Sequence, residues 1–167
     1  MGMIASYMMV NDSTLSHFLE LDIENITDEI FDLEEQEATE LIDIDKSWDG
    51  LHFILTGKPA SSPIEGDTLS EAVVGVKMFD EEGEDFIAYI PHSRIAAIVE
   101  ALETVSLEAL RQTFNPNALH KNEVYPTIWE DEDKDSLFGY LADGHNAILA
   151  FYKEAIAKNM NIVVSIL

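Results

Sequence analysis

Residues 43–57 read DIDKSWDGLHFILTG, a pattern that predicts a short helix with apolar side chains on most of its sides. The same stretch carries Asp45, Asp49, His52 and Thr56 at intervals of three or four residues, so all four are expected on one stripe of the helix. Polar groups on a buried helix need hydrogen-bond partners, because an unpaired buried group is costly. The stretch therefore predicts either a structural polar network or a functional site.

The elements around this helix predict an α+β fold. Gly57 suits the position after the last helical turn, and Pro59 prevents the helix from continuing. β-rich runs predict strands at residues 3–10, 76–79, 86–90 and 162–167, and periodic apolar residues predict helices within 15–33, 93–105, 107–114 and 134–158. Residues 69–74 are expected to start as a helical turn. Asn115-Pro116 is expected to terminate the helix predicted within residues 107–114. We expect one domain, residues 1–167, with a small, mostly antiparallel or mixed sheet packed against several helices.

Two glycines fall inside the predicted helix at residues 134–158. Gly139 and Gly144 each cost about 1 kcal/mol of helix stability relative to alanine. This cost predicts that close packing compensates at both positions.

The charge of the chain limits its partners. There are 33 Asp and Glu against 9 Lys and Arg, a formal net charge of −24 at pH 7. So few basic residues cannot easily build a cationic face for nucleic acid or an anionic membrane, so neither is expected as a direct partner. Residues 20–45 contain twelve acidic residues and no Lys or Arg. This segment is either a solvated helical face or a surface for a basic protein partner.

The absence of cysteine and of long apolar runs points to a cytoplasmic protein. Without cysteine the chain has no disulfides and no thiolate metal site. No run of 18 apolar residues is present, so no membrane span is predicted. The acidic residues at 43–49 do not form an EF-hand, because Trp48 and Ile54 stand where that loop needs Gly and Glu. No cofactor and no metal are therefore expected, and nothing in the sequence indicates an oligomeric state.

Residues 43–57, read as Asp-x-Asp-Lys-x-Trp-Asp-x-Leu-His-Phe-x-Leu-Thr-Gly, resemble the YfbM-like family of small bacterial proteins, a domain of unknown function. Residues 69–75, LSEAVVG, are similar to its Leu-Ser-x-Ala-Val-x-Gly element, and residues 123–126, EVYP, to its Ile-Tyr-Pro turn. Tyr89 and the helix from Pro91 resemble its strand-then-helix step. The resemblance implies a single-domain α+β fold in a bacterial cytosol. It supplies no established reaction, so no catalytic residues carry over.

The candidate pocket combines the stripe with nearby polar and aromatic residues. Asp49 and His52 are three residues apart, so a carboxylate–imidazole hydrogen bond is expected, with the Thr56 hydroxyl nearby. Such a pair can orient a general base in an enzyme. It can equally supply the hydrogen-bond partner that a buried core histidine needs. Ser70 either joins the pocket or caps its turn, and Tyr125 either lines the pocket or stacks in a rigid turn. Trp48 is likewise either a core anchor or a pocket wall.

Three functions follow from these observations. The favoured one is a non-enzymatic protein-interaction module, for example of the inhibitor or immunity type, that binds a basic partner through its acidic surface. The alternative is a small-molecule-binding or hydrolytic protein with a pocket around Asp45, Asp49, His52 and Thr56. The third interpretation is that the acidity is an adaptation to high salt, which screens repulsion between like charges. No recognisable catalytic motif is present, which favours a protein that is not an enzyme.

Overall fold

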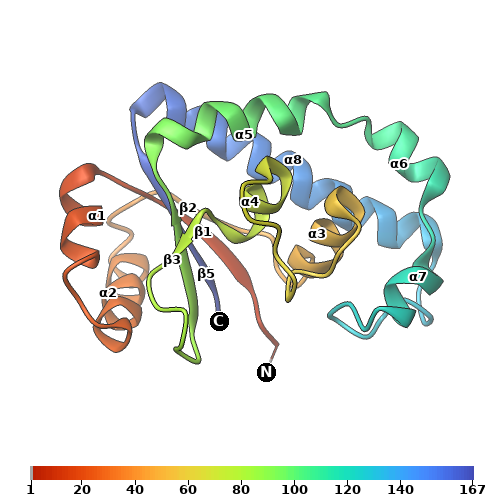
Figure 1. Cartoon of the computed structure of the whole chain (residues 1–167), viewed down its shortest axis with the longest axis horizontal. Coiled ribbons are helices and arrows are strands. Elements are labelled where there is room, and N and C mark those ends of the chain that lie inside the picture. The colour runs from red at the N-terminus through yellow and green to blue at the C-terminus, as the bar shows by residue number, and fades with distance from the viewer. Residues whose placement is uncertain (1) are drawn as a thin grey trace.

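The sheet at the centre of the molecule is entirely antiparallel. The computed structural model describes residues 2–167, which form five strands and eight helices (Figure 1). The strands are β1 (Ala5–Val10), β2 (Leu41–Asp43), β3 (Lys77–Met78), β4 (Phe86–Ile90) and β5 (Asn161–Ile166). They lie in the order β2-β1-β5-β4-β3, and each neighbouring pair is antiparallel. The α+β prediction is confirmed, and the centre of the sheet joins β1 to β5.

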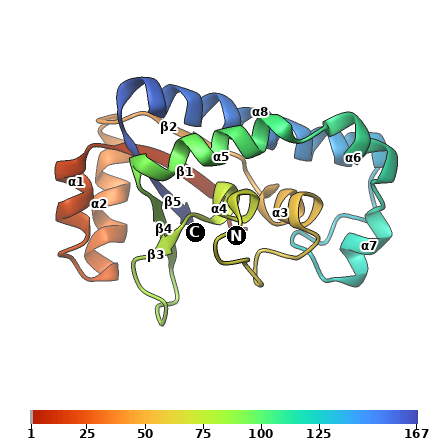
Figure 2. The same ribbon diagram turned by 45° about the horizontal axis from the view of Figure 1, so that its top comes forward.

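Helices lie on both faces of this sheet. One face carries α1 (Asp12–Phe18) and α2 (Ile23–Glu35), and the other carries α3 (Trp48–Thr56), α4 (Thr68–Val74), α5 (His92–Thr104) and α8 (Lys134–Lys158). Figure 2 shows α5 and α8 running side by side. The short helices α6 (Leu107–Thr113) and α7 (Pro116–Lys121) lie at the end of the molecule farthest from α1 and α2 (Figure 1).

Strand alternation divides the apolar residues between these two faces. In β1, Tyr7 and Met9 pack in the core beneath α3, α4, α5 and α8, whereas Met8 and Val10 pack against α1 and α2. β5 follows the same rule, because successive side chains of a strand point to opposite faces. All six residues of β5 are buried, as expected for a central strand covered on both sides. A third apolar cluster surrounds Trp129, beside α7 and the start of α8.

The structure adds elements that the sequence pattern did not predict. β2 was not expected, and the helical turn at residues 69–74 is the complete helix α4, capped by Asp67, whose carboxylate accepts hydrogen bonds from two backbone N–H groups. The helix before Asn115-Pro116 already ends at Thr113. Asn115 is instead the N-cap of α7, and Pro116 occupies its first turn, where the missing N–H has no cost. The end of α3 agrees with prediction, since Gly57 has the left-handed conformation, with φ at 81°.

The two glycines of α8 differ in their surroundings. A Cβ added at Gly144 would lie 2.9 Å from Ser47 Oγ and 3.6 Å from Leu51 Cδ2, so close packing explains this glycine. At Gly139, no atom of residues 2–167 outside the immediate helix would lie within 4 Å of an added Cβ. The prediction of close packing at Gly139 is therefore wrong, because this position faces open space.

Substituting each glycine by alanine is expected to change stability in opposite directions. Gly139→Ala should raise the free energy of unfolding by up to about 1 kcal/mol through helix propensity. Gly144→Ala should lower it by about 1–3 kcal/mol, because the new methyl group overlaps the buried Ser47 hydroxyl. Urea denaturation of both variants checks this contrast within one helix. A stabilising Gly144→Ala would show that α3 can move away from α8 at little cost.

Candidate functional site

Asp49 lies in the first turn of α3 and fastens two distant loops. Its side chain is buried, and Oδ1 accepts a hydrogen bond from the backbone N–H of Ala60 at 2.6 Å. Oδ2 accepts from the backbone N–H of Tyr125 at 2.8 Å. Hydrogen bonds from N–H groups to a carboxylate are stronger than neutral ones. The carboxylate therefore holds the loop after α3 and the loop after α7 against the same helix.

His52, one turn further along α3, is completely buried between a loop and a neighbouring helix. Its Nδ1 lies 2.7 Å from the carbonyl oxygen of Lys58, and its Nε2 lies 2.7 Å from Ser70 Oγ. Because a carbonyl only accepts, Nδ1 carries the proton and Nε2 accepts from the Ser70 hydroxyl. Ser70 Oγ in turn accepts from the backbone N–H of Ile64 at 3.0 Å. Both ring nitrogens therefore bind groups that position residues 58–70.

The expected bond between Asp49 and His52 is not formed. Both oxygens of Asp49 bind backbone N–H groups, and both ring nitrogens of His52 bind groups of residues 58–70. Thr56 does lie beside the imidazole, with Oγ1 3.2 Å from Nδ1, while its hydroxyl donates to the carbonyl of His52 at 2.8 Å. The stripe is thus a set of separate attachments rather than a carboxylate–imidazole pair.

Asp45 does not belong to this stripe. α3 begins at Trp48, and Asp45 precedes it in a turn with a positive φ of 50°. Helical spacing from Asp49 therefore does not apply to Asp45, and its carboxylate accepts instead from the hydroxyl of Tyr140 on α8 at 2.7 Å. The sequence-based placement of Asp45 beside Asp49 and His52 is wrong for this reason.

Trp48 and Tyr125 hold the segment that leads into β1. Their rings stack with centroids 5.4 Å apart and an angle of 27° between the planes. The indole N–H of Trp48 donates to the carbonyl of Met3 at 3.0 Å, and the backbone N–H of Met3 donates to the Tyr125 hydroxyl at 3.0 Å. In this arrangement the two rings act as a clamp on the backbone, with their polar groups already bound.

Burial lowers the pKa of His52 below its ordinary value of about 6.5. The hydrogen bond to Lys58 and the charges of Asp49 and Asp67 act in the opposite direction and are weaker. The unfolded chain therefore binds a proton more readily than the folded one. The contribution of His52 to stability is complete above about pH 6.5 and is lost as the pH falls toward the lowered pKa.

We expect the free energy of unfolding to fall more steeply in wild type than in His52→Gln as the pH is lowered below about 6.5. Comparison of the two chains cancels the titration of the many carboxylates they share. Urea denaturation at a series of pH values gives the two slopes, and the NMR titration of the His52 imidazole gives its midpoint. Identical slopes would show that folding leaves the pKa of the His52 imidazole unchanged.

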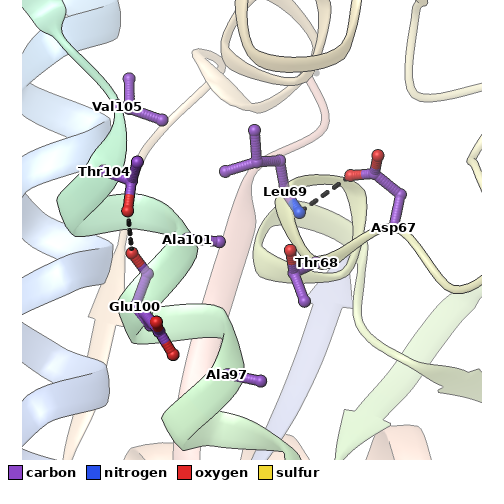
Figure 3. Close-up of a pocket in the computed structure, with 8 residues that line it drawn as sticks. All are labelled: Asp67, Thr68, Leu69, Ala97, Glu100, Ala101, Thr104 and Val105. Atoms are coloured by element: carbon purple, nitrogen blue, oxygen red, sulfur yellow. Dashed lines mark hydrogen bonds between the residues drawn. The ribbon is translucent and has the colours of Figure 1, made fainter.

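A surface groove of about 540 Å³ lies between the start of α4 and one side of α5 (Figure 3). Ala97, Ala101 and Leu69 supply apolar walls. The Asp67 carboxylate in this groove accepts from the backbone N–H of Leu69 at 2.9 Å, so it acts as a helix cap. The hydroxyl of Thr104 donates to the carbonyl of Glu100 within the same helix. The Glu100 carboxylate and the Thr68 hydroxyl also line the groove, so these are the side-chain groups there that could orient a substrate.

A second cavity, of about 480 Å³, adjoins the polar network. It is bounded by the loop before α4, by α4 itself and by the β3–β4 hairpin, and Ser70 and Glu71 line it. The Glu71 carboxylate binds Arg94 in a two-pronged ion pair, with distances of 2.6 and 3.2 Å. Ser70 is thus the residue that joins His52 to a cavity.

The sequence reasoning missed a third groove, on the opposite face of the molecule. We call it the Phe31 groove; its volume is about 250 Å³, and its lining includes Ile4, Phe31, Glu34, Asp43, Ser165 and Leu167. The Phe31 side chain is 53% exposed on α2. Its position in the sequence gave a signal, since Phe31 lies outside the buried stripe formed by Ile26 and Ile30.

Two further findings concern residues 2–167. No group of three or more His, Asp or Glu side chains there is arranged to hold a metal ion. Within the same residues, no helix combines the length and the apolar character needed to cross a membrane.

Comparisons with known proteins agree with the resemblance carried by residues 43–57. The chain is 28% identical to protein YfbM of Escherichia coli (strain K12) over 159 residues, which cover 95% of this chain and 94% of that protein. The crystal structure of YfbM from Escherichia coli, described as a protein of unknown function, matches with a TM-score of 0.81 at 26% identity and covers 99% of this chain and 100% of its own. A family model for a domain of unknown function, DUF1877, matches residues 1–165. This bacterial relative, the shared fold and the matched family model together show that the chain belongs to the DUF1877 family.

Proposed function

We propose that the protein is a non-enzymatic interaction module of the bacterial cytoplasm that binds a basic protein through its acidic surface. The observation that carries this proposal is the unneutralised charge of α2. The helix carries six carboxylates and no Lys or Arg. Of these six, Glu29 alone contacts a basic side chain within residues 2–167, with its carboxylate 2.7 Å from Nε2 of His17. The other five carboxylates therefore remain available to cations from outside the chain.

Such a surface acts on association rates as well as on affinity. A concentrated negative potential attracts a basic partner over a distance of about 10 Å at 0.1 M salt, and this distance shrinks as salt is added. Acidic inhibitor or immunity proteins use this principle when they cover the phosphate-binding site of a nuclease. One version of the proposal is therefore an inhibitor whose carboxylates replace the phosphates of a nucleic acid.

Affinity capture at low salt tests this function. The immobilised protein should retain a basic protein from its native cytosol and release it as salt is raised. The matched control replaces Asp28, Asp32 and Glu35 with their amides, which preserves shape and removes charge. If no basic protein is retained, and stability instead rises strongly with added KCl, the acidity is an adaptation to salt and the proposal fails.

The alternative, a small-molecule or hydrolytic site, has support from one contact. The Ser70 hydroxyl donates to a neutral His52 beside the 480 Å³ cavity, which is the relation of a nucleophile to its base. Against it, Ser70 is only 1% exposed, and its oxygen already accepts from Ile64. A thermal-shift screen of wild type and Ser70→Ala against small molecules tests whether this site binds a ligand. A ligand at 100 times its Kd raises the melting temperature by roughly 5–10 °C, and a real site would lose this shift in Ser70→Ala.

A further inference from the structure

We infer that the Phe31 groove is the surface that binds the basic partner, and that it accepts a segment in which Arg or Lys flanks one bulky apolar side chain. This inference rests on the proposed function and adds to it the place of contact and the chemistry of the contacting segment.

The groove exists because helices cover only part of one sheet face. α1 and α2 pack over Met8, Val10 and Val163. Further along the same strands, Ser6 pairs with Asp43 on β2 and with Ser165 on β5, so these three residues form a row across the sheet. The row lines the floor of the groove, and Phe31 of α2 lines its wall. An extended segment can therefore lie along the uncovered end of the sheet.

Exposed apolar side chains gather in this groove. Phe31 is 53% exposed and Ile4 is 40% exposed, and both line it. Exposed apolar patches with a polar rim are typical of protein-interaction sites. The volume of about 250 Å³ lies below the roughly 300–1,000 Å³ of small-molecule sites. A side chain of a partner fits this space better than a separate ligand does.

The acidic residues of the groove determine which residues should flank the apolar side chain of the partner segment. Glu34 and Asp43 line the groove, and no Lys or Arg is among its lining residues in the part of the chain described, 2–167. On α2, Asp28 and Glu35 lie three residues before and four residues after Phe31, which places them on the same side of the helix. A guanidinium or ammonium group would lie over the Phe31 ring, within reach of these carboxylates. The groove therefore favours a basic segment over a neutral one.

The floor also carries a hydroxyl-bearing residue. Ser165 lines the groove and is 6% exposed. A serine in this place can offer a hydrogen bond to the backbone of an incoming segment.

Binding of two probe peptides to the isotope-labelled protein tests this inference. The first is a short fluorescent peptide that alternates Arg and Leu, and the second has Ser in place of each Leu. We expect the first to bind at low salt, with NMR shift changes confined to α2 and the adjoining ends of β1, β2 and β5. The second peptide should bind at least about tenfold more weakly, because it lacks the apolar anchor.

Two matched variants localise the contact. Phe31→Ala should lower the affinity for the Arg–Leu peptide by at least about tenfold, whereas Leu19→Ala should leave this affinity unchanged. Leu19 is also 53% exposed but lies at the end of α1, outside the groove. Because both side chains are largely in water, both variants should fold, which circular dichroism checks.

The groove and the proposed function fail in different ways. Equal affinities of the two variants, equal affinities of the two peptides, or no binding at all would overturn the groove. If affinity capture still retains a basic protein and Phe31→Ala retains it equally, the proposed function stands without the groove. If the probe peptide binds at Phe31 but the cytosol yields no basic protein, the groove is supported as a surface and the proposed function fails.

Discussion

Asp49→Ala should lower the free energy of unfolding by about 3–4 kcal/mol. The substitution leaves the backbone N–H groups of Ala60 and Tyr125 without their acceptor, and each unsatisfied buried donor costs roughly 1–3 kcal/mol. It also releases two loops that are far apart in the sequence from a shared helix. Urea denaturation followed by circular dichroism measures the change.

Asp49→Asn is the matched control for this prediction. The amide keeps one oxygen as an acceptor but turns an NH₂ group toward the other N–H, so a loss of about half the size is expected. Hydrogen exchange should show faster opening at Ala60 and Tyr125 in both variants. A loss below about 0.5 kcal/mol in Asp49→Ala would mean that other contacts hold these loops.

His52→Ala should lower the free energy of unfolding by about 3 kcal/mol. The change removes the closer of two partners of the Lys58 carbonyl and the acceptor of the Ser70 hydroxyl, and it leaves a cavity in a fully buried place. Ser70→Ala removes the partner of His52 Nε2 and of the Ile64 N–H. It should still cost less, about 1–2 kcal/mol, because the imidazole keeps its bond to Lys58 and only a small volume is lost. Thermal and urea denaturation of the two variants show which of them loses more stability.

The His52→Ala variant also distinguishes a structural His52 from one that belongs to a binding site. A structural role predicts that His52→Ala loses stability with no accompanying loss of a ligand. If instead His52→Ala kept wild-type stability and lost a thermal shift that wild type shows, the polar network would be a binding site, and the interaction module would be the weaker hypothesis.

Elements with a strong apolar pattern were predictable from the sequence, and elements without one were not. Residues 134–158 carry enough apolar repeats to define α8, and residues 86–90 define β4, so both agree with the structure. β2 has three residues within an acidic segment, and it exists because it pairs with β1. That pairing is a tertiary contact, which local pattern does not contain.

The site was predictable in its need for partners but not in their identity. The sequence shows that Asp49 and His52 lie on an apolar helix and must be satisfied. Their partners are mostly backbone groups of loops, among them the carbonyl of Lys58 and the N–H of Ala60, and any residue type supplies such groups. The Phe31 groove was hidden for a related reason, because its floor comes from strands separated by most of the chain.

The pairing of β1 with β5 sets the order in which the protein can fold. Residues 5–10 bind residues 161–166, so the middle of the sheet cannot close until nearly all of the intervening chain has been synthesised. α2 and the helices that follow can form earlier, whereas the apolar side chains of β1 stay exposed to water until β5 pairs with it. The full chain has a net charge of −24, so we expect electrostatic repulsion to reduce association between chains at this stage. The acidity that we assign to partner binding would then also limit aggregation during synthesis.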